Sequence, residues 1–277
     1  MSTVPASPQL GEGPRFRNRT PWWRRVLRGI GGRMFRLAEN NDDSRLAHNG
    51  EGWLLRELMR AHVRQGSARP FVACDAGANA GDYTREILRV AREERCPVAV
   101  HVFEPAPACV EVLRRAFASE AEVRIVAAAL GEAPGEALLY NGRSGSSQAS
   151  LVPRHGHADE AAEHLPVPVI RLDNYLREQN IALLDLLKLD VEGSELAALR
   201  GLGDWLRPEA VAVVQFEYGG TTLDARTSLR DFAALFHAHG YVLAKLFPRA
   251  LEQRDYQPWM DHFAYSNYVA MASRRRP

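Results

Sequence analysis

Short apolar runs alternate with segments of helical periodicity along most of the chain. The runs predict strands at residues 71–75, 98–103, 123–130, 137–140, 183–190, 210–217, 241–247 and 267–272. Apolar residues at helical spacing predict helices at residues 51–64, 82–93, 106–118, 194–199 and 228–239. The predicted strands are almost continuously apolar, which is typical of strands with both faces buried. Such strands alternating with helices predict an α/β fold with a doubly wound, mostly parallel sheet.

The first 45 residues differ in composition from the rest of the chain. Residues 1–14 are rich in Pro, Gly and Ser, which predicts disorder. Arginines and large apolar residues then alternate, and Pro21 suits the start of a helix. Such a basic amphipathic segment can pack on its own domain or on a second copy of the chain, or lie on an anionic membrane surface. We expect an arm at residues 1–45 that packs on protein, followed by one domain at 46–277.

Composition is that of an ordinary soluble protein. The 277 residues can hold one large α/β domain with an extension, and 46% of them are hydrophobic and 25% charged. A net charge of +1 gives no reason to expect a nucleic-acid partner. The cysteines Cys74, Cys96 and Cys109 lack metal-site spacing and are expected to be buried free thiols. Without a membrane-length apolar run or a secretory signal, we expect a cytoplasmic protein.

The most informative segment is a small-residue turn after the first predicted strand. The turn reads Gly-x-Asn-x-Gly, formed by Gly77, Asn79 and Gly81, and it leads into a helix. A turn of this kind lets a ligand approach the backbone and the positive end of the helix dipole. Asp82 stands where a dinucleotide-binding motif has its third glycine, and its charge would repel a pyrophosphate. The segment therefore favours a nucleoside-like cationic ligand, and S-adenosylmethionine fits that description.

Acidic residues end several of the predicted strands. They are Asp75 after the first, Glu104 after the second, Asp190 with Glu192 after the fourth, and Glu217 after the fifth. Ligands of open parallel sheets bind at this edge, so these carboxylates predict a cationic or hydroxyl-rich ligand, or a metal. Glu104 can accept both hydroxyls of a ribose, or it can cap the following helix. Asp75 likewise can bind a ligand or cap the following turn.

A second acidic segment follows the fourth predicted strand. Asp190 and Glu192 are two residues apart, so their side chains point the same way if the strand continues. Either could be a general base for an acceptor hydroxyl, or could orient it through a divalent ion. The alternative for Glu192 and Ser194 is that they stabilise the start of the next helix.

These motifs together resemble those of a known family. The blocks that carry the resemblance are residues 75–84, Phe103-Glu104-Pro105 and residues 188–195 with Leu199 and Gly201, supported by residues 216–218 and 267–269. The chain resembles FkbM-family methyltransferases, a branch of the class I S-adenosylmethionine-dependent enzymes. The resemblance covers about residues 70–272, and it departs from the family at Ala76, where a valine is usual.

The resemblance implies a fold, a reaction and a site. The fold is Rossmann-like with an antiparallel final strand, and the reaction is methyl transfer to a hydroxyl of a sugar or polyketide-type natural product. The implied cofactor residues are Asp75, Ala76, Gly77, Asn79, Gly81, Tyr83, Thr84, Glu104, Pro105 and Asp190. The implied catalytic residues, which would face the acceptor, are Asp190, Glu192 and Glu217. Related enzymes use magnesium, but the sequence has no dedicated Asp-Asp pair, so we assign no metal ligands.

Two other functions stay open at this point. A nicotinamide-dependent oxidoreductase is disfavoured by Asp82 and the Gly-x-Asn-x-Gly turn. A non-catalytic cofactor-binding or scaffold protein on a methyltransferase fold is disfavoured by the intact set of carboxylates. The expected partner is a small hydroxyl-bearing molecule, and a homo-oligomer is left open.

Overall fold

The computed structural model describes residues 20–41, 43–46, 48–140, 149–153 and 164–272. By contacts the chain divides into two units, residues 1–40 and 41–277. The described part of the first unit is the helix α1 (Trp22–Ala38), which begins after Pro21 as the sequence predicts. Residues 1–14, where we predict disorder, lie outside the described residues. Among the helices described, none is long and apolar enough to cross a membrane.

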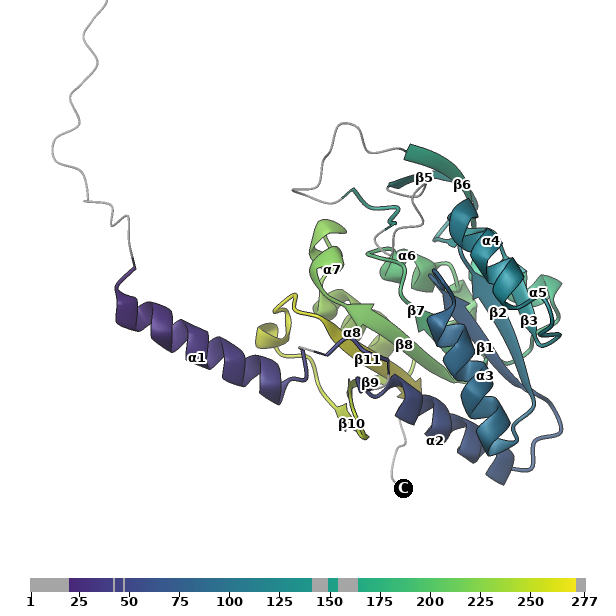
Figure 1. The fold of residues 1–277 in the computed structure, drawn as a ribbon, viewed down its shortest axis with the longest axis horizontal. Helices are drawn as coiled ribbons and strands as arrows, with labels where there is room; N and C mark the ends of the chain where they lie inside the picture. The colour runs from purple at the N-terminus through teal and green to yellow at the C-terminus, as the bar shows by residue number, and fades with distance from the viewer. Residues whose placement is uncertain (1–19, 42, 47, 141–148, 154–163, 273–277) are drawn as a thin grey trace, which may run out of the picture. The chain divides into compact units, whose positions relative to one another are not determined.

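The second unit is built on one large sheet of mostly parallel strands (Figure 1). The strand order is β10-β9-β11-β8-β7-β1-β2-β3. The bounds are β1 (Phe71–Ala76), β2 (Val98–Phe103), β3 (Val123–Val126), β7 (Leu186–Leu189), β8 (Val213–Tyr218), β9 (Tyr241–Phe247), β10 (Ala250–Gln253) and β11 (Ser266–Ala272). Strands β3, β2, β1, β7 and β8 pair in parallel, whereas β11 runs antiparallel between β8 and β9. This topology confirms a Rossmann-like class I methyltransferase fold with an antiparallel final strand.

Helices cover both faces of this sheet, as Figure 1 shows. Their bounds are α2 (Glu51–Arg64), α3 (Asp82–Glu94), α4 (Pro107–Ala116), α5 (Leu172–Glu178), α6 (Glu195–Arg200), α7 (Gly220–Asp224) and α8 (Leu229–Ala238), with short 3-10 turns η1 (Gly203–Trp205) and η2 (Pro258–Met260). One core packs α2, α3 and α4 against the sheet, and the other packs α5, α6 and α8 against the opposite face. Neighbouring β1 residues enter different cores: Ala73 joins the first and Cys74 the second. Because both faces are buried, the strands read as continuous apolar runs.

A small second sheet corrects part of the sequence prediction. It has the order β4-β6-β5, with β4 (Ala129–Leu130), β5 (Gly135–Tyr140) and β6 (His164–Ile170). The predicted strand 123–130 is wrong as one element, because β3 ends at Val126 and β4 pairs in the other sheet. We missed β6 because Pro166 and Pro168 mark a run as a poor strand. Strand β6 forms nonetheless because every residue of β5 pairs with it, whereas β4 pairs only with the last residues of β6.

The predicted free thiols are confirmed, since all three cysteines are buried and unpaired. The predictions also missed β10 and α5, which lie in segments without a clear apolar period. Elsewhere β2 and β9 match the predicted ranges and α3 ends one residue later, whereas β7 and β8 each begin three residues after the predicted starts at 183 and 210.

Candidate active site

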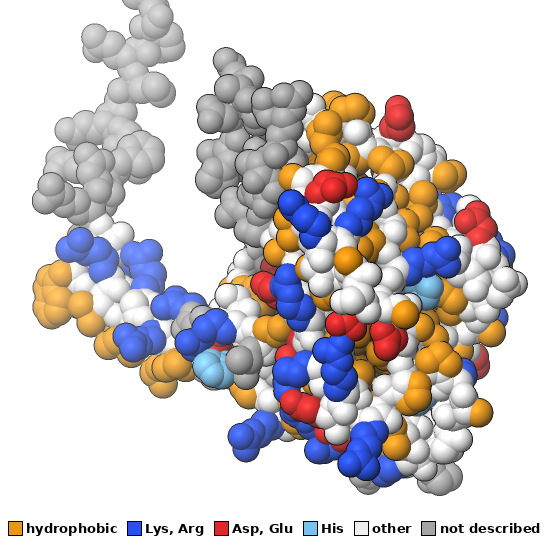
Figure 2. All heavy atoms as spheres, turned by 45° about the vertical axis from the view of Figure 1, so that its right-hand side comes forward, with side chains coloured by type: hydrophobic (Ala, Val, Ile, Leu, Met, Phe, Trp, Pro, Cys, Tyr) orange, Lys and Arg blue, Asp and Glu red, His pale blue; other side chains and the backbone are white. Residues whose placement is uncertain are grey.

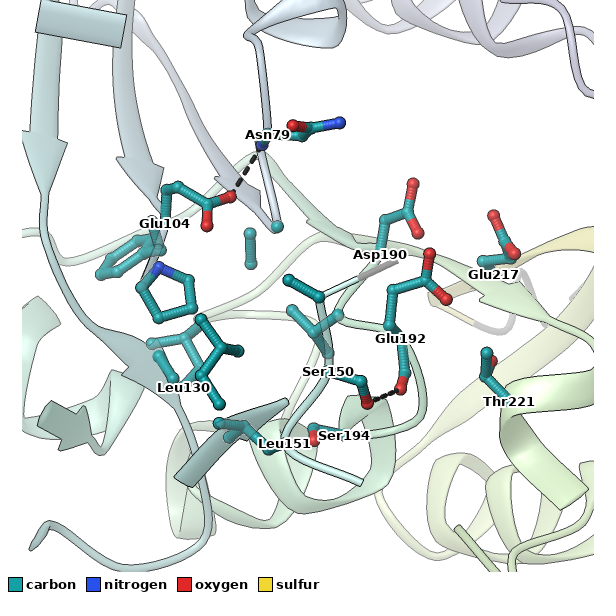
Figure 3. A pocket seen from close by; sticks show the side chains of 18 of the residues that line it. Asn79, Glu104, Leu130, Ser150, Leu151, Asp190, Glu192, Ser194, Glu217 and Thr221 are labelled. Atoms are coloured by element: carbon teal, nitrogen blue, oxygen red, sulfur yellow. Dashed lines mark hydrogen bonds between the residues drawn. The ribbon is translucent and has the colours of Figure 1, made fainter. Parts of the chain in front are cut away.

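A cavity of about 710 Å³ opens at the carboxyl ends of the parallel strands (Figure 3). It is a typical size for a small-molecule or cofactor site. Eight of the predicted site residues line it: Ala76, Gly77, Asn79, Glu104, Pro105, Asp190, Glu192 and Glu217. Four others do not line it, namely Asp75, Gly81, Tyr83 and Thr84.

The glycines of the turn after β1 let backbone segments approach each other. Gly77 has φ +80°, and a Cβ there would lie 1.8 Å from the carbonyl oxygen of Asp190. This turn therefore contacts the turn after β7 and brings the two predicted motifs together. Gly81 has φ +86°, and a Cβ there would lie within 3 Å of the side chains of Leu113 in α4 and of Phe117 directly after it. Its lack of a side chain is thus required by helix packing, away from the cavity.

Asp75 and Thr84 lie beneath the turn instead of facing the cavity. Both are fully buried, and the Thr84 hydroxyl donates a 2.6 Å hydrogen bond to Asp75 Oδ2. Burial raises the pKa of Asp75, although the nearby Lys188 ammonium opposes this shift. Asp75 thus fixes the start of α3 to β1. Its side chain does not line the cavity, so neither ligand binding nor capping of the turn by Asp75 is borne out by these contacts.

Glu104 forms one side of the cavity directly after β2. Its Oε2 accepts a 2.8 Å hydrogen bond from the backbone N–H of Asn79, and its Oε1 accepts one of 2.8 Å from that of Ala106. Burial raises the pKa of this carboxyl group, and the two N–H donors partly offset the shift. Since each carboxylate oxygen has two lone pairs, Glu104 can still accept hydrogen bonds from a ligand. Since Ala106 immediately precedes α4, this carboxylate also lies at the start of that helix, and ribose binding by Glu104 stays a prediction.

Three carboxylates gather on the other side, as Figure 3 shows for Asp190, Glu192 and Glu217. Asp190 follows β7, and Glu217 lies near the end of the neighbouring strand β8. Burial raises the pKa of Glu217, and the negative charges of Asp190 and Glu192 raise it further. Within the described residues, no group of three or more His, Cys, Asp or Glu side chains is placed to hold a metal ion.

Lys188 supplies the positive charge beneath this acidic group. Its buried ammonium donates a 2.8 Å hydrogen bond to Asp190 Oδ2 and lies 5.0 Å from the centre of the Tyr83 ring. Burial lowers the pKa of Lys188, but the carboxylates of Asp190, Glu51 and Asp75 outweigh it and raise the pKa overall. The sequence signal for this residue was a lysine in the middle of an apolar strand. Lys188 begins the block 188–195, and the sequence predicted no separate role for it.

The start of α6 depends on Glu195 instead of Glu192. The buried Glu195 carboxylate accepts hydrogen bonds from the backbone N–H groups of Val191 and Gly193. Burial raises the pKa of Glu195 to about 7. Ser194 makes no side-chain capping bond, and the Glu192 backbone carbonyl accepts a 2.6 Å hydrogen bond from the Ser150 hydroxyl. The Glu192 side chain lines the cavity.

A buried polar network that the sequence did not reveal lies behind the acidic group. Asn49 donates a 2.6 Å hydrogen bond to Glu51 Oε2, and Gln215 donates to the other oxygen of the same carboxylate. The Tyr83 hydroxyl donates a 2.9 Å hydrogen bond to Gln215 Oε1. Asn49 also reaches the hydroxyl of Tyr265, which lines the cavity. In sequence, Glu51 reads only as an acidic residue in the first turn of a helix.

Comparison with known proteins identifies the family. The family model described as Methyltransferase FkbM domain matches residues 75–243, more than half of the chain. This chain belongs to the FkbM methyltransferase family. The part of this FkbM-family protein that matches begins at Asp75 and includes Glu104, Asp190, Glu192 and Glu217. Both sides of the cavity therefore come from the family domain.

Two curated relatives agree with this assignment. The chain is 29% identical over 233 residues to 31-O-demethyl-FK506 methyltransferase FkbM of Streptomyces tacrolimicus, covering 72% of this chain and 85% of that protein. It is 29% identical over 194 residues to Methyltransferase sdnD of Sordaria araneosa, covering 59% and 73%. The crystal structure of Methyltransferase FkbM from Methylobacillus flagellatus KT aligns with a TM-score of 0.47 at 16% identity. That alignment covers 74% of this chain and 46% of the solved chain, so this chain spans less than half the length of the solved protein.

Proposed function

We propose that this FkbM-family protein transfers a methyl group from S-adenosylmethionine to a hydroxyl of a sugar or natural-product acceptor. The observation that carries the proposal is the two-sided cavity. Glu104, beside the glycine turn, is suited to bind hydroxyls, and Asp190, Glu192 and Glu217 face it from the other strands. Acceptor chemistry is supported by the Streptomyces relative, whose name describes an O-demethyl compound.

The residues present fit the proposed cofactor. The cavity volume suits a ligand of nucleoside size. Glu104 is anchored by two backbone N–H groups, so its carboxylate is held in place to accept the hydroxyls of a ribose. The acidic group provides a negative field for a cation such as a sulfonium. When bound, S-adenosylmethionine would supply an electrophilic methyl group to the acceptor oxygen, with the C–S bond breaking as the C–O bond forms and S-adenosylhomocysteine as the leaving group.

The carboxylates then have separate roles toward the acceptor. A hydroxyl is a poor nucleophile, so transfer needs a base close to its proton. Glu217 is suited to take that proton, because burial and its acidic neighbours raise its pKa and make its carboxylate a stronger base than a free one. Asp190, held by the Lys188 ammonium, is suited to orient the hydroxyl, and Glu192 adds a second acceptor of hydrogen bonds. Alignment of the reacting atoms supplies most of the remaining rate enhancement.

The first test is binding measured by isothermal titration calorimetry. We expect S-adenosylmethionine and S-adenosylhomocysteine to bind, and NAD and NADP not to bind. Glu104→Gln should weaken S-adenosylmethionine about tenfold, since one carboxylate oxygen becomes an amide that cannot accept a hydroxyl proton. The matched control is Glu111→Gln on α4, whose carboxylate is exposed and paired with Arg114. Equal affinities for both variants would contradict the role of Glu104, and failure of the wild type to bind would refute the proposal.

The second test separates an enzyme from a scaffold. Release of S-adenosylhomocysteine is measured with a panel of hydroxyl-bearing glycosides and polyketides, alongside the same compounds with the hydroxyl already methylated. Turnover on the free hydroxyls alone is expected, because the methylated analogues have no proton for Glu217 to accept. Tight binding of S-adenosylmethionine without turnover on any acceptor would favour the scaffold alternative.

A further inference from the structure

The helix α1, which belongs to the first unit of the chain, is amphipathic. Its large exposed apolar side chains are Trp22, Trp23, Val26, Leu27, Ile30, Met34 and Leu37, which are 47% to 70% exposed. At 3.6 residues per turn they fall within an arc of roughly 140° around the helix axis. Four of the five arginines, Arg24, Arg25, Arg28 and Arg36, lie on the opposite arc. Figure 2 shows hydrophobic side chains along one edge of this helix and basic side chains along the other.

The sequence of α1 is a poor helix former in water. Gly29, Gly31 and Gly32 lie in its interior, and glycine is among the least favourable residues there. Within its own unit α1 buries no side chain, so the helix by itself packs no apolar face. Helices gain most of their stability from packing an amphipathic face against something apolar. The helix therefore needs a surface that accepts its apolar arc.

The charges of α1 indicate which surface that is. Residues 20–38 contain five arginines and neither Asp nor Glu. Pairing with the same helix of a second copy would bring two groups of five positive charges together without a compensating acidic residue. An anionic lipid surface supplies both an apolar interior for the apolar arc and negative headgroups for the arginines. Tryptophans also suit this boundary, because each ring combines an apolar body with an N–H donor.

We propose that α1 binds anionic phospholipid membranes, lying in the plane of the surface with its apolar arc inserted among the lipids. Arg33, next to Trp22 at the edge of that arc, extends its aliphatic stem along the surface and its guanidinium to the headgroups. This inference favours the membrane alternative over the protein-packing arm that the sequence suggested. It is independent of the proposed methyl transfer.

The test is co-sedimentation of the full chain with large unilamellar vesicles. Vesicles of phosphatidylcholine containing phosphatidylglycerol should bind the protein at least about tenfold better than pure phosphatidylcholine, and raised salt should weaken that binding. Trp23→Ser with Ile30→Ser should abolish binding, because it removes large side chains from the centre of the arc. The matched control is Val63→Ser with Val112→Ser, which removes two exposed apolar side chains from the domain.

Each outcome decides the proposal. Arg24→Gln with Arg28→Gln should weaken binding to phosphatidylglycerol vesicles about tenfold, whereas Arg24→Lys with Arg28→Lys should retain it, because charge and not guanidinium shape is required. No vesicle binding, equal binding to neutral and anionic vesicles, or equal losses in the control variant would overturn the proposal. The proposal would also be overturned if the chain formed a concentration-dependent dimer, and Trp23→Ser with Ile30→Ser abolished that dimer while vesicle binding persisted. Thermal melting of each variant confirms that the domain is folded.

Discussion

The buried Lys188 beneath the acidic group gives the most direct test of the site. Its ammonium donates to Asp190 Oδ2 at 2.8 Å, and the charges of Glu51 and Asp75 also stabilise it. Replacing Lys188 by Met keeps most of the apolar stem and removes the charge. The variant leaves buried carboxylates without their cation, which costs far more free energy than the loss of an exposed ion pair.

The size of the effect follows from the burial of the two partners. Removing one partner of a fully buried pair costs about 3–5 kcal/mol. The Lys188 side chain is 7% exposed but that of Asp190 is 33% exposed, so water recovers part of the loss. We expect the free energy of unfolding to fall by about 2–4 kcal/mol. At roughly 2–4 °C for each kcal/mol in a domain of this size, Tm should fall by about 4–16 °C.

Urea denaturation and thermal melting measure this loss. The matched control is Arg114→Met on α4, which breaks an exposed pair with Glu111 and should cost under about 1 kcal/mol. If Lys188→Met melts within about 1 °C of the wild type, Lys188 is not the counterion of the acidic group. An equally large loss of unfolding free energy in Arg114→Met would show that burial of the ion pair does not decide the cost of breaking it.

The pH dependence of the Lys188→Met penalty checks the same reasoning. Lys188 lowers the pKa of Asp75 and of Glu51 against the effect of burial, so without it both folded-state pKa values rise further. A folded-state pKa above the unfolded value destabilises the fold increasingly as pH rises. The penalty of Lys188→Met should therefore be smaller at about pH 5 than at about pH 8. A penalty that is larger in acid would refute the assignment.

Three further substitutions test the turn and the acidic group. Gly77→Ala should lower the free energy of unfolding by more than about 3 kcal/mol, because its Cβ would overlap the Asp190 carbonyl. The control Gly66→Ala, also at positive φ but in open space, should cost about 1 kcal/mol. Equal urea midpoints for the two variants would contradict this reasoning. Glu217→Gln should lower kcat about 100-fold and remove the rise of the wild-type rate as pH increases through the raised pKa of Glu217, and an unchanged pH–rate profile would argue against a base there. Asp190→Asn should lower kcat/KM at least about tenfold, and normal turnover with normal cofactor affinity would exclude Asp190 from the reaction.

Much of the site could be read from sequence because it lies where strands end. Glu104, Asp190 and Glu217 come at or near the carboxyl ends of three parallel strands, and in an open parallel sheet those ends share one edge. We could therefore predict that these three residues lie close together without knowing the order of the strands in the sheet. The second sheet was harder, since β6 is interrupted by prolines and forms only because β5 pairs along it.

Other parts of the site depend on contacts between residues far apart in the chain. Asp75 and Glu104 look alike in sequence, since each is an acidic residue at the end of an apolar run. Side-chain direction in the folded strand separates them, placing Asp75 under the turn with Thr84 and Glu104 in the cavity. The pairing of Gln215 with Glu51, 164 positions apart, has no local pattern that could predict it.

The sequence by itself determined the alternation of strands and helices, the glycine turn and the acidic residues at the sheet edge, because hydrophobic period and backbone freedom are local properties. Only the tertiary structure decided which carboxylates face the cavity, that Glu195 and not Glu192 stabilises the start of α6, and that Lys188 lies beneath Asp190. Burial, charge pairing and pKa depend on what packs around a group. Those neighbours come from strands and helices that the chain brings together only when it folds.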